Sequence, residues 1–342
     1  MLQCRHFCNK LWQASRFTTL LRERAGDFIQ NNDDDNNNTE KSLLQRWIHS
    51  RLAYVVDEVN DSLNAYDAAR AAHTLRTFIQ NEFCSVFIEF AKPTQYKESC
   101  DLAGNLNVTS QVASQVLDCS LKLLHPFMPY VTEALYEHTS FDVEKEESIM
   151  LTHFPKQSSM MRDTKAEQDM TKLLDTLRAI RSVRKRASEI GLTQESLGKI
   201  RVVVVNEQDE NFLRLYSDAL LAQCKGVSVL EISESKEGEE LECSLVSSVP
   251  SLCRVYLDLE KSADAMERMD KELNRIEKKS KKLQKKHDRV LKSYEKSSSS
   301  KTSVPEHVLE TQRKDLSDLR EQLDALSDSE SSVRDVLRMF SE

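Results

Sequence analysis

The chain has 342 residues, enough for two or three domains with sizeable cores. Charged residues make up 30% of it and the formal net charge is −8, while only six glycines and six prolines favour long helices over short strands and tight turns. No run of ~18 apolar residues occurs, which argues against a membrane-spanning helix. The acidic total does not exclude a nucleic-acid partner, because such binding depends on local basic surfaces.

The N-terminal residues 1–30 are expected to form one amphipathic helix, with an apolar face made by Phe7, Leu11, Ala14 and Phe17. Before Glu23 this segment carries basic residues and no acid, which is also typical of a mitochondrial presequence. We expect the structural helix and a cytoplasmic protein. A mitochondrial location is the alternative.

A polar tract, Asn31–Asn38, should end this helix as a mobile loop, because its side chains compete for backbone hydrogen bonds. Thr39–Ser42 offers N-cap residues for a helix that begins near Leu43. Further helices are expected over 66–90 and 108–139, the second broken by prolines at 126 and 129. Residues 1–155 are therefore predicted to form an all-α bundle.

Residues 156–260 change in character and predict a small α/β domain. A helix over 163–190 precedes the β-branched run Ile200–Val205, which is typical of a buried strand. Shorter apolar runs at Val227–Ile232 and Val255–Leu259 predict two more strands, with a helix at 209–222. The order of the strands cannot be read from the sequence.

Residues 261–342 follow a heptad pattern in two arms. The heptad positions of the first arm, mostly apolar, are Met266, Met269, Leu273, Ile276, Ser280, Leu283, His287, Val290 and Tyr294, and those of the second are Leu309, Gln312, Leu316, Leu319, Leu323 and Leu326. The polar segment Ser297–Ser303 lies between them, and Pro305 suits the first turn of a helix. These features predict an antiparallel coiled-coil hairpin, so the whole fold should be mainly α.

The charges of the two arms favour their pairing. Asp264–Lys296 has 12 Lys or Arg against 7 Asp or Glu, whereas Val304–Leu326 has 3 against 6. Each exposed pair contributes only ~0.2–1 kcal/mol, so these charges select the partner more than they drive folding.

Sequence motifs for catalysis or metal binding are absent. There is no phosphate-binding glycine loop, no H-E-x-x-H and no G-x-S-x-G, so no catalytic, cofactor or metal residue is assigned. The eight cysteines form no C-x-x-C pair, which suits reduced thiols in an intracellular protein. Lys278–Lys282 resembles an ATP-binding K-M-S-K-S loop only superficially, because Ser280 falls on a heptad position of a long helix.

Two basic surfaces are candidates for binding phosphates. The first is the helix face with Arg178, Arg181 and Lys185, opposite the apolar Leu173, Leu177, Ile180 and Ala187. The second, on the first heptad arm, comprises Lys278, Lys279, Lys281, Lys282, Lys285 and Lys286. A solvated helix face is the alternative for both. The aromatic Phe78, Phe83 and Phe87 could stack on bases, but their helical spacing favours the core.

Several segments resemble valyl-tRNA synthetases, in the same order along the chain. They are Phe7–Trp12 (Phe-Cys-Asn-Lys-Leu-Trp), Arg46–Leu52, Glu82–Cys84, Glu89–Pro93, His125–Leu135 and Val304–Val308. The first string and the terminal hairpin point to the valine enzyme over its leucine and isoleucine relatives. In that family the opening string lies where the catalytic domain passes into the anticodon-binding helices, so this chain looks like the C-terminal half of such an enzyme.

The resemblance implies an anticodon-binding bundle over 1–155, a connecting domain over 156–260 and a coiled-coil arm over 261–342 that touches the outer corner of tRNA. The full enzyme would use ATP to attach valine to tRNA-Val. This chain has no counterpart of the active site or the editing domain, so alone it is expected to be inactive. Arg51, within the Arg46–Leu52 segment, joins the candidate tRNA contacts.

The sequence also departs from the family. Ser85 and Val86 stand where Asp and an aromatic residue are usual, and Gln80 stands where Trp is common. If these positions shape the anticodon pocket, recognition of tRNA-Val is affected.

The expected partners are therefore tRNA and a catalytic half or other synthetase components. The chain could be a fragment, an incomplete gene product or a stand-alone paralogue. The alternative of a different class is a non-catalytic scaffold whose bundle and hairpin bind proteins.

Overall fold

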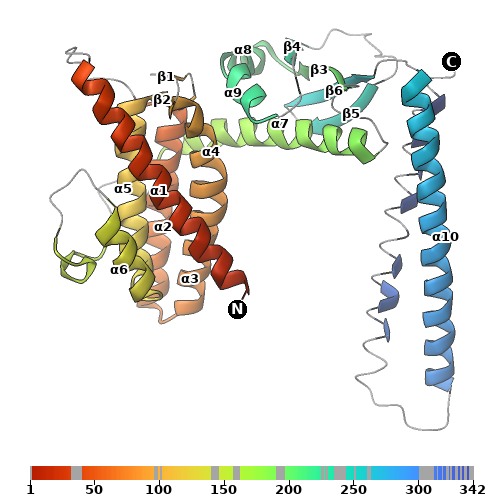
Figure 1. The fold of residues 1–342 in the computed structure, drawn as a ribbon, viewed down its shortest axis with the longest axis horizontal. Helices are drawn as coiled ribbons and strands as arrows, with labels where there is room; N and C mark the ends of the chain where they lie inside the picture. Colours follow the sequence, from red (N-terminus) through yellow and green to blue (C-terminus); the bar gives the residue numbers. More distant parts are fainter. Residues whose placement is uncertain are drawn as a thin grey trace. The chain divides into compact units, whose positions relative to one another are not determined.

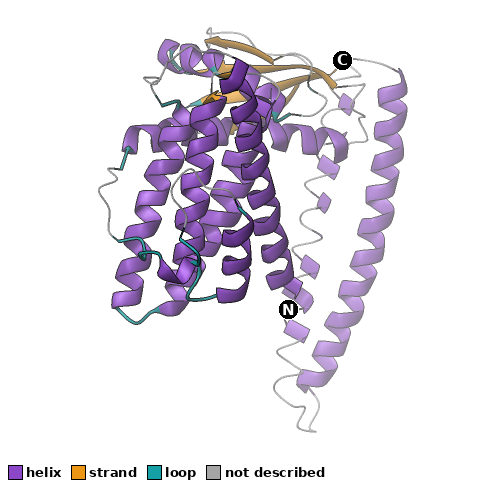
Figure 2. Cartoon of the chain, turned by 60° about the vertical axis from the view of Figure 1, so that its left-hand side comes forward, coloured by secondary structure: helices purple, strands orange, loops and turns teal. Residues whose placement is uncertain are grey.

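The computed structural model describes residues 2–31, 41–95, 99–100, 102–139, 146–156, 162–189, 197–224, 227, 230–234, 244–249, 252–259 and 263–299, and separate positions between 312 and 338. The chain divides into two compact units (Figures 1 and 2). Unit 1 comprises Met1–Leu174 and Leu215–Gln223, and unit 2 comprises Asp175–Arg214 and Cys224–Glu342. The three-part division drawn from the sequence stays a prediction.

Unit 1 is a bundle of helices whose apolar faces meet in one core. Its helices are α1 (Leu2–Asn31), α2 (Leu43–Asn64), α3 (Ala68–Thr77), η1 (Phe78–Phe87), α4 (Ile88–Ala91), α5 (Leu106–Leu124), α6 (Pro129–His138), α9 (Ser217–Ala222) and the first part of α7 (Thr164–Glu189). Helix α1 packs on α5, and α2 packs on α3 and α5. The side chains of Leu11, Ile48, Phe83 and Leu117 are fully buried there.

Part of the predicted helix over 66–90 is a π-helix, which the sequence did not predict. Residues Phe78–Phe87, the segment η1, form a π-helix, in which each N–H bonds the carbonyl five residues earlier. The short α4 continues it, followed by the 3₁₀ turn Lys92–Gln95. Phe78, Phe83 and Phe87 are 0–1% exposed, which confirms their assignment to the core.

Helix α2 begins at a capping box. The Ser42 N–H donates to Oε1 of Gln45 at 2.9 Å, and the Gln45 N–H donates to Oγ of Ser42 at 3.4 Å. The small hairpin β1 (Ser99–Cys100) and β2 (Gly104–Asn105) lies against this cap, because Gln45 Nε2 also donates to the Ala103 carbonyl at 2.8 Å. The predicted N-cap within Thr39–Ser42 is thus confirmed at Ser42.

The proline break is also present, since α5 ends at Leu124 and α6 starts with Pro129 at its first position. The expected mobile loop at Asn31–Asn38 lies outside the described residues, apart from Asn31 at the end of α1.

Unit 2 contains a four-stranded mixed sheet with the strand order β4-β3-β6-β5. The strands are β3 (Leu197–Val204), β4 (Leu230–Glu234), β5 (Ser244–Val249) and β6 (Cys253–Leu259). Strands β3 and β4 are parallel and their connection includes α8 (Glu207–Leu215), whereas β6 is antiparallel to both β3 and β5. Val202 and Val255 pair in the centre and are fully buried.

Helix α7 contributes its apolar stripe to unit 2 as the sequence predicted, with Leu177, Ile180 and Ala187 at most 3% exposed. The three expected strands are present, with bounds shifted by up to three residues. The sequence missed β5, because its Ser-rich run lacks the β-branched composition of a typical strand. The helix expected over 209–222 is divided at Tyr216 into α8 and α9.

The long helix α10 (Ala263–Ser299) carries the first heptad arm, and the described positions of the second arm lie antiparallel to it. Arg313 Nε donates to the Tyr294 hydroxyl at 2.7 Å, and Arg334 Nη2 pairs with Oε1 of Glu277 at 3.0 Å. Predicted heptad positions on both arms are buried, among them Met269, Ile276, His287, Leu316 and Leu319. The coiled-coil geometry stays a prediction, and most of the turn Ser297–Ser303 and Pro305 lie outside the described residues.

We expect Gly104→Ala to lower the free energy of unfolding by ~2 kcal/mol, because φ there is +76° and an added Cβ would lie 2.9 Å from Cβ of the Ser42 cap. Urea unfolding followed by circular dichroism measures this. Gly26→Ala is the control, since nothing lies within 4 Å of its added Cβ and it sits inside α1. That change should be neutral or stabilise by ~0.5–1 kcal/mol. Equal losses in both variants would contradict the argument.

Candidate nucleic-acid interface

A groove of about 1100 Å³ runs along α1 in unit 1. One wall is α1 and the other is formed by the end of η1 with α4, and His138 of α6 also lines it. Its polar and aromatic lining includes His6, Lys10, Trp12, Gln13, Arg16, Glu23, Cys84, Ser85, Glu89 and Lys92, so three cations share the groove with two carboxylates. The groove thus offers both polar and aromatic surface in one concavity.

Two cations in the groove have no carboxylate partner among the described residues. Among the described residues, Lys10 Nζ donates only to the neutral Oγ of Ser85, at 3.4 Å, and Arg16 is exposed six residues later in α1. Lys92, by contrast, pairs with Oε1 of Glu89 at 2.6 Å. Lys10 and Arg16 therefore keep charge that an anionic ligand can use.

An aromatic ring accompanies these charges. Trp12 lines the groove and is 46% exposed, although large apolar side chains are usually covered. A groove with more cations than carboxylates and an accessible aromatic ring is suited to single-stranded nucleic acid, since the cations attract phosphates and the ring stacks on any base.

Sequence reasoning missed these residues. It used α1 for its apolar face, where Phe7, Leu11 and Ala14 are indeed buried. The available signal was Trp12, which lies off the apolar face and near Lys10 and Arg16 in the sequence. A helix that only packs against a core does not require a Trp at such a position.

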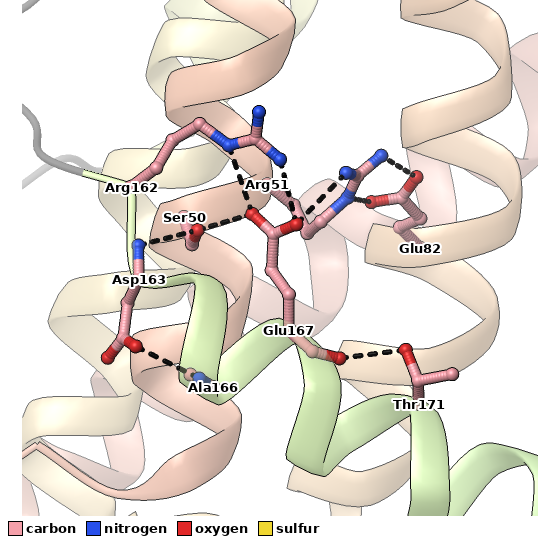
Figure 3. A network of polar contacts seen from close by, with 8 residues as sticks. All are labelled: Ser50, Arg51, Glu82, Arg162, Asp163, Ala166, Glu167 and Thr171. Atoms are coloured by element: carbon pink, nitrogen blue, oxygen red, sulfur yellow. Dashed lines mark hydrogen bonds and ion pairs between the residues drawn. The ribbon is translucent and has the colours of Figure 1, made fainter.

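Arg51 lies in a polar network rather than on an open surface (Figure 3). Its Nε and Nη2 donate to both oxygens of Glu82, at 2.7 and 3.0 Å, and its Nη1 lies 3.6 Å from Oε2 of Glu167. The guanidinium carbon also lies 4.9 Å from the ring centroid of Tyr54. Arg51 thus joins α2, η1 and the first turn of α7.

Glu167 accepts the remaining hydrogen bonds of this network. Arg162 donates to both of its oxygens, at 2.9 and 3.3 Å, and the Ser50 hydroxyl donates at 2.5 Å. Burial by itself would raise the pKa of Glu167, but the hydrogen bonds from Arg162 and Ser50, with the charge of Arg51, outweigh it and lower that pKa. The carboxylate is therefore stabilised in its charged form.

The face of α7 with Arg178, Arg181 and Lys185 belongs to unit 2, and all three side chains are exposed. Arg178 pairs with Asp175 one turn earlier. This face presents several cations at helical spacing, as the sequence predicted, although it is partly neutralised by Asp175.

The lysine surface of α10 is more strongly cationic. All six predicted lysines are exposed, and none has an ion pair with a described residue. Arg289 and Lys292 extend the same exposed surface, and Asp288 is the acidic residue among them. The sequence reasoning missed these two because it stopped at the densest lysine cluster.

Cys84 and Cys119 are half-buried and their thiols are weak nucleophiles at neutral pH. Burial raises the pKa of Cys84 to about 11 and that of Cys119 to about 12, so both thiols are protonated at neutral pH. The part of the chain that the structure describes holds no cluster of His, Cys, Asp or Glu that could bind a metal ion. It also holds no helix able to span a membrane.

Comparison with known proteins gives a family match that begins in α2, after the α1 wall of the groove. Residues 45–199 match the anticodon-binding domain of tRNA ligase. The chain is 30% identical over 271 residues to the valine–tRNA ligase of Clostridium perfringens, which covers 78% of the chain and 29% of that protein. It is 30% identical over 340 residues to the valine–tRNA ligase of Thermotoga maritima, covering 96% and 34%. The chain thus spans about a third of the length of these relatives.

We expect Glu167→Gln to lower the free energy of unfolding at pH 7 by ~1–3 kcal/mol, because it leaves Arg51 and Arg162 with a neutral partner. The lowered pKa of Glu167 contributes stability above its usual value of 4.5, and this is lost as the pH falls through the folded-state pKa. Urea unfolding at pH 7, 5, 4 and 3 should therefore show the difference from wild type shrinking with acidity.

The control for this variant is Glu89→Gln, which removes an exposed pair with Lys92 and should change stability by less than ~1 kcal/mol. Half-buried His49, whose pKa is lowered to about 4 by burial and by Lys41, destabilises all variants alike below pH 6.5. Only the difference between Glu167→Gln and wild type is diagnostic, and a difference that is constant down to pH 3 contradicts the account.

Proposed function

Since this chain carries an anticodon-binding domain of the tRNA-ligase family and aligns with valine–tRNA ligases over most of its length, we propose that it binds tRNA. The observation that carries the proposal is the groove of unit 1, where Lys10 and Arg16 lack carboxylate partners beside the exposed ring of Trp12. Unpaired anticodon-loop nucleotides would enter this groove, with bases stacking on Trp12 and phosphates near the two cations.

The two helical cationic surfaces would serve the paired parts of the same RNA. Exposed lysines and arginines neutralise phosphates without reading bases, and they release counterions when they do so. Arg178, Arg181 and Lys185 on α7 and the lysine surface of α10 have the required exposure. Their role would be to hold the body of the tRNA, whereas the groove distinguishes its loop.

The finer part of the proposal concerns the tRNA and the reaction. We infer that tRNA-Val is the preferred RNA, because the relatives are valine–tRNA ligases. The ATP-dependent attachment of valine would then take place on other residues than those described, with this chain supplying RNA binding. A catalytic half or other synthetase components would be its protein partners.

The groove can be tested with Lys10→Ala combined with Arg16→Ala. We expect this variant to bind an anticodon stem-loop at least ~10-fold more weakly at ~50 mM salt. The logarithm of its affinity should also fall less steeply with that of the salt concentration, by ~0.7 for each lost phosphate contact in a single strand. Fluorescence anisotropy of labelled RNA measures both. Lys165→Ala, an exposed cation of α7 in the same unit, is the control, and an equal loss in the control would contradict the groove.

The cationic surfaces of α7 and α10 are tested by comparing full-length tRNA with the isolated stem-loop. Arg178→Ala with Arg181→Ala, and separately Lys281→Ala with Lys285→Ala, should weaken binding of full-length tRNA and flatten its salt dependence. Neither variant should change the affinity for the isolated stem-loop, because that RNA lacks the distant phosphates. Unchanged salt dependence with full-length tRNA would show these residues to be solvated surface.

A further inference from the structure

The second wall of the groove is formed by η1, which also contacts Arg51. Within the ten residues of η1, Glu82 pairs with Arg51 of α2, while Cys84 and Ser85 line the groove toward α1. The Ser85 hydroxyl donates to the carbonyl of Gln80, five residues earlier, at 2.6 Å and accepts from Lys10 at 3.4 Å. The backbone geometry of η1 therefore fixes the positions of Glu82 toward Arg51 and of Cys84 and Ser85 toward the groove.

The apolar sequence favours this wide helix. Phe78, Phe83 and Phe87 are five and then four residues apart, whereas an α-helix brings residues three and four apart to one face. A π-helix accommodates the longer step, and all three rings are buried, with Phe83 and Phe87 stacked at 5.7 Å between centroids. If the segment tightened to an α-helix, the rings could not all stay buried while Glu82 and Ser85 kept their partners.

Arg51 is poorly placed to bind RNA directly. All three of its guanidinium nitrogens face carboxylates of Glu82 or Glu167, and one face of the group lies on Tyr54. Its side chain is 23% exposed. A phosphate would have to displace a bidentate pair, which is among the stronger polar interactions in proteins.

We propose that Arg51 is a positioning residue, which fixes the register of η1 through Glu82 and so holds the Cys84–Ser85 wall in place for RNA. This rests on the proposed function for its ligand, but the structural claim is independent of RNA. Arg51→Lys tests it well, because lysine keeps the charge and loses the planar, two-pronged hydrogen bonding. The wall should then move although the network remains neutral overall.

Cys84 provides a readout that a general loss of stability would not mimic. Its thiol is half-buried in the wall, and Cys119 on α5 is a second protected thiol away from the groove. Alkylation of the folded protein, followed residue by residue with peptide mass spectrometry, compares the two. In Arg51→Lys, Cys84 should react ~10-fold faster than in wild type while Cys119 keeps its rate.

The same variant should bind the anticodon stem-loop ~10-fold more weakly, equivalent to ~1.4 kcal/mol. The matched control is Arg70→Lys, which alters another arginine–glutamate pair of unit 1, with Nε 2.6 Å from Oε1 of Glu58, away from the groove wall. Neither Cys84 reactivity nor RNA affinity should change there. Glu82→Gln replaces Arg51→Lys if that protein does not fold.

The outcomes separate the two proposals. Equal acceleration of Cys84 and Cys119, or no acceleration of either, overturns the positioning role. Faster Cys84 alkylation with wild-type RNA affinity overturns it as well, because the wall would then not matter for the ligand. If wild-type protein binds no RNA, the proposed function fails, and Cys84 alkylation still decides whether Arg51 positions the wall.

Discussion

The structure of unit 1 depends on one arginine. Arg51 satisfies Glu82 in η1 and approaches Glu167 in α7 while stacking on Tyr54, so three helices meet at a single guanidinium (Figure 3). Removing one partner from such a half-buried network leaves a charged group with fewer hydrogen bonds, which costs more than an exposed ion pair contributes. The groove wall and the start of α7 thereby become parts of one polar arrangement.

This arrangement explains how an acidic chain can present a basic interface. Several acids of unit 1 pair with basic side chains of the same unit, as Glu82 does with Arg51, Glu167 with Arg162 and Glu89 with Lys92. Lys10 and Arg16 have no ion pair with a described residue, and neither do the six α10 lysines. Binding of a polyanion depends on these local charges, so a net charge of −8 is compatible with the proposed tRNA binding.

The sequence predicted features that depend on local pattern. The proline break before α6, the Ser42 cap and the buried strand β3 all follow from spacing or from residue type, and the structure has each of them. Several heptad positions are also buried, such as Met269 and Leu316, whereas Met266 at the start of the first arm is exposed. The resemblance of several segments to valyl-tRNA synthetases is matched by the similarity of the chain to known tRNA ligases. Local signals were thus sufficient for the fold class and the family.

Features that depend on distant contacts could not be read. Arg51 and its partner Glu82 are 31 residues apart, and Glu167 is farther still along the chain, so nothing local indicates that Arg51 faces these carboxylates rather than RNA. The π-helix was hidden because its five-residue step resembles an imperfect α-helical pattern. The groove cations could not be recognised from the sequence either, because their lack of acidic partners depends on how the helices pack.

The central claim is that unpaired RNA binds in the groove of unit 1, and Trp12 reports on it directly. The chain has two tryptophans, and Trp47 is buried at 5% exposure whereas Trp12 lines the groove. Titration with an anticodon stem-loop at ~50 mM salt should quench the fluorescence of wild-type protein, and Trp12→Phe should abolish the quenching. Binding detected by anisotropy without any change in Trp12 fluorescence, or no binding at all, would contradict the account.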